Sequence, residues 1–230
     1  MIPATACPLG RGEPWRPFPA SRCAGAYDRE LGSSIARPRG KVLGVGLNKT
    51  GTTTLGACLS HWGFRHVGWD GEAFELWRNG RTDELLARVE QYDSLEDFPW
   101  LLLHEEIDAA FPGSKFILTT RISAKTWFRS VCAHADKTGP HPVNLSVYGH
   151  AMPRGHGRRH IQIYEDHNRK LREYFRGRPD DFLDACWEQG DGWRELGEFL
   201  GLKAPDLPFP HANKSPTGIE RIKRRIRGWV

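Results

Sequence analysis

A run of ten residues contains two glycines, one lysine and four threonines, the residue types from which phosphate-binding loops are built. Residues 46–55 read GLNKTGTTTL. Glycines let backbone N–H groups approach an anion closely, and a helix that begins in the run would aim its unpaired N–H groups at the same anion. Lysine adds a positive charge, and the threonine hydroxyls add hydrogen-bond donors. The run therefore predicts a phosphate loop; the alternative is a Gly/Thr-rich turn with a capping threonine.

The order of these residues differs from the phosphate loop of ATPases and GTPases. In those proteins a lysine directly follows the second glycine, and the next hydroxyl holds magnesium. Here Thr52 follows Gly51, and Lys49 lies two residues before that glycine. This order disfavours a nucleotide triphosphatase and predicts a site that needs no metal. A P-loop kinase of small molecules stays open as an alternative.

A second candidate anion site begins about 70 residues later, at Arg121. This arginine directly follows the apolar segment KFILTT, and Ser130 comes nine residues after it. A guanidinium group is a permanently charged, forked donor that suits phosphate, although an arginine at the end of a strand often forms only an ordinary ion pair. Ligands of parallel sheets bind beyond the carboxyl ends of the strands, where both candidate sites are expected to lie.

The remaining pattern alternates strands with helices and predicts an α/β fold. The fold class expected is a three-layer, P-loop-like architecture with a mainly parallel sheet flanked by helices. Strands are predicted at residues 41–46, 92–99, 115–120 and 181–187. Helices are predicted at residues 54–62, 72–78, 83–92, 101–111, 125–135, 161–175 and 191–200, with a long loop over residues 138–160.

Composition divides the chain into three parts. Residues 1–40 hold six prolines and a charge of +3 and are expected to form an irregular or disordered leader, or an over-extended start. Residues 41–214 are expected to form the folded domain. Residues 215–230 are expected to form a basic tail, whose end, IERIKRRIRGWV, is amphipathic enough for peripheral contact with an anionic membrane or for a surface helix. The net charge of +5 therefore resides in the ends.

Five cysteines without close spacing disfavour a disulfide framework or a zinc site. No apolar run is long enough to span a membrane, and no signal peptide is recognisable, so a cytoplasmic location is expected. No nucleic-acid-binding motif accompanies the basic ends, so no nucleic-acid partner is expected. Four histidines in the 138–160 region match no usual zinc spacing.

Together, the two anion-binding segments resemble those of sulfotransferases that use 3′-phosphoadenosine-5′-phosphosulfate (PAPS). The resemblance covers residues 41–214 and is similar in detail to a bacterial branch of that family, through the stretches DSLEDFPW, PGSKFILTTR, YEDHN, CWEQGDGW and PFPHANK. It implies PAPS as co-substrate. The residues that it assigns to the 5′-phosphosulfate are Asn48, Lys49, Thr50, Gly51, Thr52, Thr53 and Thr54.

The resemblance also implies the rest of the site. Arg121 and Ser130 would hold the 3′-phosphate; their spacing exceeds the usual one by one residue, so Ser123 is an alternative partner. Lys49 would stabilise the leaving phosphate. Asp97, two residues before a proline, occupies the place of the family's catalytic histidine and would be the base. The open alternatives for the base are Asp93, His66, Asp70, His104 and Glu105.

The sequence predicts a transferase acting on a hydroxyl or amine of a small molecule, glycan or lipid. It leaves open the identity of this acceptor and the oligomeric state. A nucleotide-binding module without catalytic activity is the third functional alternative, beside the kinase.

Overall fold

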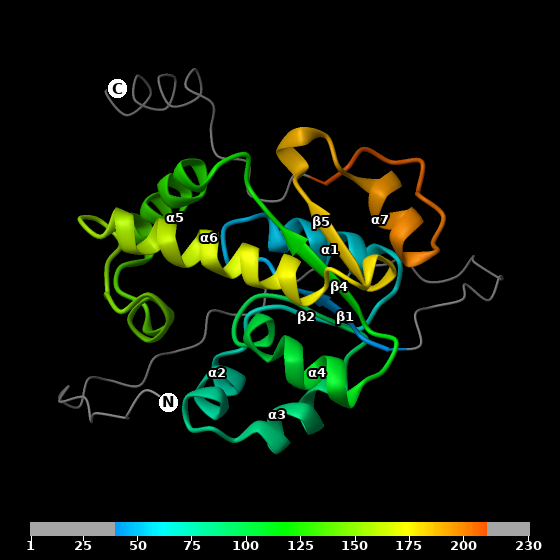
Figure 1. The fold of residues 1–230 in the computed structure, drawn as a ribbon, viewed down its shortest axis with the longest axis horizontal. Coiled ribbons are helices and arrows are strands. Elements are labelled where there is room, and N and C mark those ends of the chain that lie inside the picture. Colours follow the sequence, from blue (N-terminus) through cyan, green and yellow to red (C-terminus); the bar gives the residue numbers. More distant parts are fainter. Residues whose placement is uncertain (1–39, 211–230) are drawn as a thin grey trace, which may run out of the picture. The chain divides into compact units, whose positions relative to one another are not determined.

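A computed structural model describes residues 40–210 of the chain (Figure 1). Most of the predicted leader and all of the predicted basic tail lie outside these residues. None of the described helices is both long enough and apolar enough to cross a membrane. Cys58, Cys132 and Cys186 are buried free thiols.

Five parallel strands form one sheet in the order β2-β3-β1-β4-β5. Their bounds are β1 Val42–Gly44, β2 His66–Val67, β3 Ser94–Leu95, β4 Lys115–Thr119 and β5 Phe182–Ala185. Strand β1 lies in the centre, where Leu43 is in register with Leu95 on one side and Phe116 on the other. All three residues of β1 are buried, as expected for a central parallel strand covered on both faces.

Seven α-helices within residues 40–210 surround this sheet. They are α1 Thr52–His61, α2 Gly71–Arg78, α3 Thr82–Val89, α4 His104–Ala110, α5 Ala124–Thr138, α6 Gly157–Tyr174 and α7 Trp193–Leu200. Shorter turns of 3-10 or π type are Trp100–Leu103, Asn144–Tyr148, Pro179–Asp181 and Trp187–Gln189.

Successive strand residues face opposite sides of the sheet, and their side chains pack in two separate hydrophobic cores. Val42 and Ile117 pack with the apolar residues of α1 and α7. Leu43 and Phe116 pack on the other face with residues of α3, α4 and α6; Figure 1 shows α6 crossing that face. The three-layer α/β fold predicted from the sequence is therefore confirmed.

Four local predictions need correction. The 92–99 strand is only Ser94–Leu95, and β2 was not predicted, because two-residue strands carry no periodic signal. The 101–111 helix is split into a 3-10 turn and α4. The 138–160 loop contains the Asn144–Tyr148 π turn and ends early, since α6 begins at Gly157.

Candidate functional site: two anion-binding strand ends

The 46–55 loop leaves the end of β1 and enters α1, as predicted. Its backbone adopts left-handed geometry at Lys49, with φ 69°, and at Gly51, with φ 104°. A Cβ at Gly51 would lie 2.4 Å from Trp187 Cδ1, and a Cβ at Gly46 would lie 2.2 Å from Thr119 Oγ1. Both glycines are therefore required by close packing against neighbouring strand ends.

Side chains from outside the loop hold its backbone. Trp187 Nε1 donates to the Gly51 carbonyl at 3.1 Å, and Trp127 Nε1 donates to the Asn48 carbonyl at 2.9 Å. Tyr148 donates from its hydroxyl to Asn48 Oδ1 at 3.0 Å. The loop is thus held in shape without a ligand, which is the preorganisation that an anion site requires.

The threonines of the loop differ in burial and in the hydrogen bonds that they make. Thr50 is buried; its hydroxyl donates to the Leu47 carbonyl at 2.7 Å and lies 2.6 Å from Thr119 Oγ1. Thr52 and Thr54 are also buried, whereas Thr53 is exposed. The hydroxyl of Thr50 is therefore already hydrogen-bonded within the protein. The backbone N–H of Thr50 also donates to the Leu47 carbonyl, at 3.3 Å.

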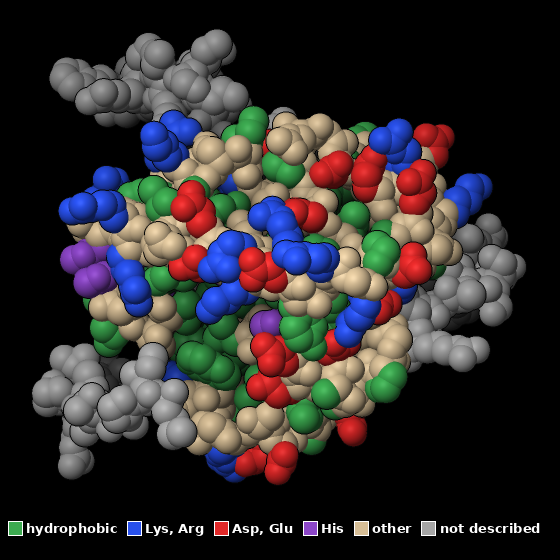
Figure 2. All heavy atoms as spheres, in the orientation of Figure 1, with side chains coloured by type: hydrophobic (Ala, Val, Ile, Leu, Met, Phe, Trp, Pro, Cys, Tyr) green, Lys and Arg blue, Asp and Glu red, His purple; other side chains and the backbone are tan. Residues whose placement is uncertain are grey.

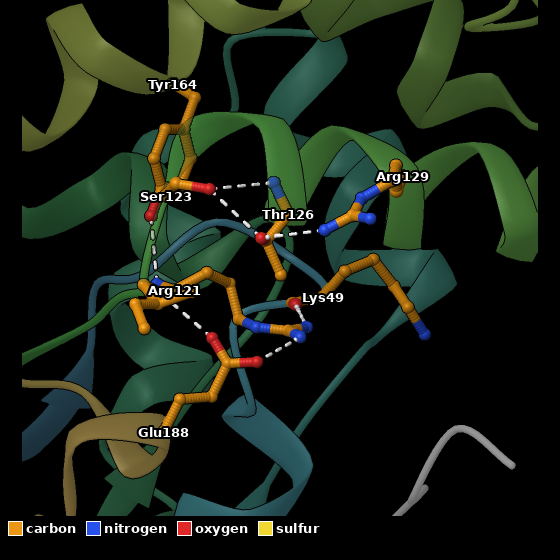
Figure 3. Close-up of polar contacts among 8 residues, drawn as sticks. Lys49, Arg121, Ser123, Thr126, Arg129, Tyr164 and Glu188 are labelled. Atoms are coloured by element: carbon orange, nitrogen blue, oxygen red, sulfur yellow. Dashed lines mark hydrogen bonds and ion pairs between the residues drawn. The ribbon is translucent and has the colours of Figure 1, made fainter. Parts of the chain in front are cut away.

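Arg121 lies beside this loop, as the sequence predicted. Its Nη1 donates to the Lys49 carbonyl at 3.1 Å (Figure 3). Its backbone N–H donates to the Tyr164 hydroxyl at 3.0 Å, and its Nε is buried without a partner among the described residues. Figure 3 shows the Lys49 side chain extending away from the guanidinium. Two separate positive charges thus flank one strand-end surface.

The other predicted phosphate ligands of this second site lie differently. Ser123 is the N-cap of α5, and its Oγ accepts from Thr126 N at 3.1 Å. Ser130 lies two turns further along α5, is partly buried and makes no hydrogen bond to Arg121 within the described chain. Instead, Glu188 contacts Arg121, with 2.6 Å between Glu188 Oε1 and Arg121 Nη2.

Asp97 follows β3 on the same edge of the sheet. With φ 66° it is, with Lys49, one of two non-glycine residues at positive φ among residues 40–210. Such strained conformations cluster at functional sites. Burial raises the pKa of Asp97, while its contact with the Phe98 N–H and the Lys49 charge oppose this rise. Burial lowers the pKa of Lys49, and the Asp97 charge opposes that shift.

A second carboxylate, Glu96, precedes Asp97 and was not predicted from the sequence. It is 6% exposed, and its Oε2 has no partner in the described part of the chain. Burial, then the Asp97 charge, raise its pKa, whereas a hydrogen bond from the Thr52 side chain lowers it. Two adjacent carboxyl groups with raised pKa values therefore border the loop.

The alternative bases mostly have structural partners. Asp93 forms an ion pair with an arginine at 2.7 Å. Asp70 caps α2 and lies 3.0 Å from another arginine. His66 Nδ1 lies 2.9 Å from a serine hydroxyl, and His104 and Glu105 belong to α4. Asp97 therefore stays the predicted base, and the neighbouring Glu96 is a second buried carboxylate at the loop.

A cavity of about 520 Å³ adjoins Arg121 between α6 and the ends of β4 and β5. Its wall includes Tyr164, Asn168, Cys186 and Asp191. Asn168 is 4% exposed, and its Oδ1 is buried without a partner in residues 40–210. Polar side chains thus make up most of the cavity wall.

Charges on the α6 face are mixed rather than basic overall. Figure 2 shows Lys and Arg side chains interspersed with Asp and Glu across this face. Arg169 pairs with Asp166 at 3.0 Å, and Arg172 pairs with Asp184 at 2.6 Å. Within the described chain, no group of three or more His, Cys, Asp or Glu is arranged to hold a metal ion.

The fold and site define an α/β protein with a candidate phosphate loop and a second candidate anion site at neighbouring strand ends. The comparison with protein families agrees: the model of the sulfotransferase domain matches residues 41–217. The chain therefore belongs to the sulfotransferase domain family, as its motifs predicted.

Individual relatives are distant. The chain is similar to "Ava biosynthesis cluster protein M" of Aspergillus versicolor, with 25% identity over 214 residues, covering 74% of this chain and 80% of the relative. Among solved structures it is similar to a gluconokinase from Sinorhizobium meliloti 1021, with 14% identity and a TM-score of 0.38, over 72% of this chain and 91% of that one. Neither likeness bears on the acceptor.

Sequence reasoning missed the groups that complete the second site. Tyr164, Trp187 and Glu188 come from α6 and from the turn after β5, far from the two motifs. The stretch CWEQGDGW, which contains two of them, supported the family resemblance but gave no indication of contact with Arg121. Only the folded arrangement reveals these partners.

Proposed function

We propose that this chain is a PAPS-dependent sulfotransferase that transfers a sulfuryl group to an acceptor hydroxyl or amine. The observation that carries the proposal is the hydrogen bond from Arg121 Nη1 to the Lys49 carbonyl, at 3.1 Å. It supports the proposal because it joins the two predicted anion sites, as the binding of one doubly phosphorylated nucleoside requires. Membership of the sulfotransferase domain family supports the same function.

The residues present fit such a donor. Both glycines of the loop pack closely against Thr119 and Trp187, which fixes the shape of the loop, and the Nε of Arg121 is buried without a partner among the described residues. Lys49, Gly51, Thr52 and Thr53 would hold the 5′-phosphosulfate, with Asn48, Thr50 and Thr54 shaping the loop around it. Arg121 would hold the 3′-phosphate, with Ser130 or Ser123 as its predicted partner.

PAPS supplies the sulfuryl group and a phosphate leaving group. Lys49 presents a positive charge in a partly buried place, where it stabilises negative charge more strongly than in water. Asp97 is the carboxylate that takes the acceptor proton. Its raised pKa makes it a stronger base than an exposed aspartate, and the nearby Lys49 keeps part of the population ionised.

The acceptor is a small molecule, a glycan or a lipid carrying a hydroxyl or amine. Trp69, 37% exposed, packs edge-to-face against His141 with the ring centroids 5.0 Å apart, and it offers an exposed aromatic surface to an acceptor. The location of the protein in the cytoplasm stays a prediction from the sequence.

Isothermal titration of the full chain with 3′,5′-ADP and, separately, with ATP and magnesium tests the donor. The proposal expects 3′,5′-ADP to bind more tightly, since it occupies both anion sites. Tighter binding of ATP would instead favour a small-molecule kinase.

A screen with radiolabelled PAPS against hydroxyl and amine acceptors then tests catalysis. Label transfer to an acceptor is expected. Tight binding of 3′,5′-ADP with no transfer to any acceptor would favour a non-catalytic nucleotide-binding module.

A further inference from the structure

A carboxylate occupies the second anion site in the structure. Glu188 Oε1 lies 2.6 Å from Arg121 Nη2, and Glu188 Oε2 accepts from the backbone N–H of Ile122 at 2.9 Å (Figure 3). One donor is the charged side chain at the end of β4, and the other is a backbone N–H just before α5. This pair is the set of donors that a phosphate group would use.

We propose that Glu188 is a specificity-determining residue, whose carboxylate takes the place of the 3′-phosphate until a donor nucleotide displaces it. This inference rests on the proposed function. It adds a competitor inside the site: the nucleotide must break the contacts of Glu188 with Arg121 and Ile122 before its own 3′-phosphate can make them.

Electrostatics requires the exchange. The Arg121 charge lowers the pKa of Glu188, so this carboxyl group is ionised at neutral pH. A phosphate placed on the same donors would bring a second anion against that carboxylate, and two like charges at such a distance repel. Glu188 therefore has to turn away when a 3′-phosphate binds.

The local structure permits that movement without unfolding the turn. The side chain of Glu188 is 34% exposed and can rotate into solvent. The neighbouring backbone is held independently, because Trp187 Nε1 donates to the Gly51 carbonyl at 3.1 Å and Gln189 N donates to the Cys186 carbonyl at 2.8 Å. The exchange thus needs a change of side-chain rotamer only.

Ligands without a 3′-phosphate do not require the exchange. A nucleotide with a free 3′-hydroxyl leaves the Arg121–Glu188 pair intact, and its hydroxyl can donate to the carboxylate. Glu188 therefore weakens the binding of 3′-phosphorylated ligands only. It reduces the factor by which the site prefers such ligands over those with a free 3′-hydroxyl.

The test compares wild type with Glu188→Gln by isothermal titration with 3′,5′-ADP and with 5′-AMP. Glutamine keeps the size of the side chain and removes its charge. Glu188→Gln should bind 3′,5′-ADP roughly two- to fivefold more tightly, the range expected on removing one partly exposed ion pair. Its affinity for 5′-AMP should change less than twofold, by the same reasoning.

Glu165→Gln is the matched control, because Glu165 is an exposed carboxylate on the wall of the adjoining cavity. It should leave both affinities unchanged; tightening equal to that of Glu188→Gln would mean a general charge effect and overturn the proposal. Glu188→Ala, as a second variant, should tighten 3′,5′-ADP binding in the same direction.

The outcomes separate this inference from the proposed function. If wild type prefers 3′,5′-ADP and Glu188→Gln binds it equally or more weakly, Glu188 only positions Arg121, and this inference alone fails. If neither protein prefers 3′,5′-ADP over 5′-AMP, both fail. A wild-type preference for 3′,5′-ADP that grows in Glu188→Gln supports the exchange.

Discussion

The 46–55 loop and the strand-end residues around it are built in opposite ways. The loop is one contiguous segment that contains its glycines and its lysine, although side chains from other elements hold its backbone. The strand-end residues Asp97, Arg121 and Glu188 come from three segments, and they lie at one edge of the sheet because parallel strands end there; of the three, Arg121 and Glu188 contact each other. On the proposed function, the residues for the 5′ end can be recognised within one stretch of sequence, whereas those for selectivity and proton transfer depend on the assembled sheet.

Replacing Asp97 tests the strand-end residues most severely. Asp97→Asn should lower the rate of sulfuryl transfer by about 10²–10⁴-fold, the usual contribution of a positioned base, while 3′,5′-ADP binding is retained. Asp93→Asn, on the same segment but paired with an arginine, should keep most of the rate. A greater loss in Asp93→Asn would contradict the assignment of the base.

The pH dependence of the rate gives an independent check on Asp97. A base acts only when deprotonated, so the rate should rise with pH as Asp97 ionises. Because burial raises this pKa, the rise should lie above the usual range of an aspartate. Asp97→Asn should abolish this limb of the pH–rate profile, and an unchanged limb would assign it to another group.

Replacing Lys49 tests the chemistry of the loop itself. Lys49→Met should lower the transfer rate by about 10²–10³-fold, the typical effect of removing one electrostatic stabiliser of the transition state. The loss of 3′,5′-ADP affinity should be smaller, since backbone N–H groups remain. Lys170→Met, which removes an exposed lysine from α6, is the control and should have the wild-type rate.

Gly51→Ala tests the shape of the loop with the smallest expected effect. Its Cβ would lie 2.4 Å from Trp187 Cδ1, so the loop must shift, and 3′,5′-ADP binding should weaken roughly tenfold. Gly80→Ala is the matched control: it also has positive φ but meets nothing within 4 Å. If both variants lost equal affinity, the contact with Trp187 would be irrelevant to binding.

The sequence allowed much of the site to be predicted where the signal is local. The glycines, Lys49 and the strand before Arg121 can each be recognised from a few consecutive residues. The sequence therefore predicts the loop and the position of Arg121 after β4. Long amphipathic helices were found for the same reason.

The remainder depends on contacts between distant residues. Glu188 follows β5, and its approach to Arg121 requires the pairing of β4 with β5. Glu96 is recognisable as unusual only once its burial is known. The β2 strand spans two residues and forms only through pairing with β3. The pairing of Ser130 with a 3′-phosphate remains a prediction.

The most direct test of the central claim is the ratio of the affinities for 3′,5′-ADP and 5′-AMP, measured by isothermal titration in wild type and Arg121→Ala. The account predicts that wild type favours 3′,5′-ADP by about tenfold or more, the scale of a charge-assisted hydrogen-bonded pair. In Arg121→Ala, and in the double variant Arg121→Ala with Glu188→Gln, the ratio should approach one while 5′-AMP binding persists. A wild-type ratio near one, or a ratio that survives loss of Arg121, would contradict the claim that these two strand ends hold the two ends of one donor.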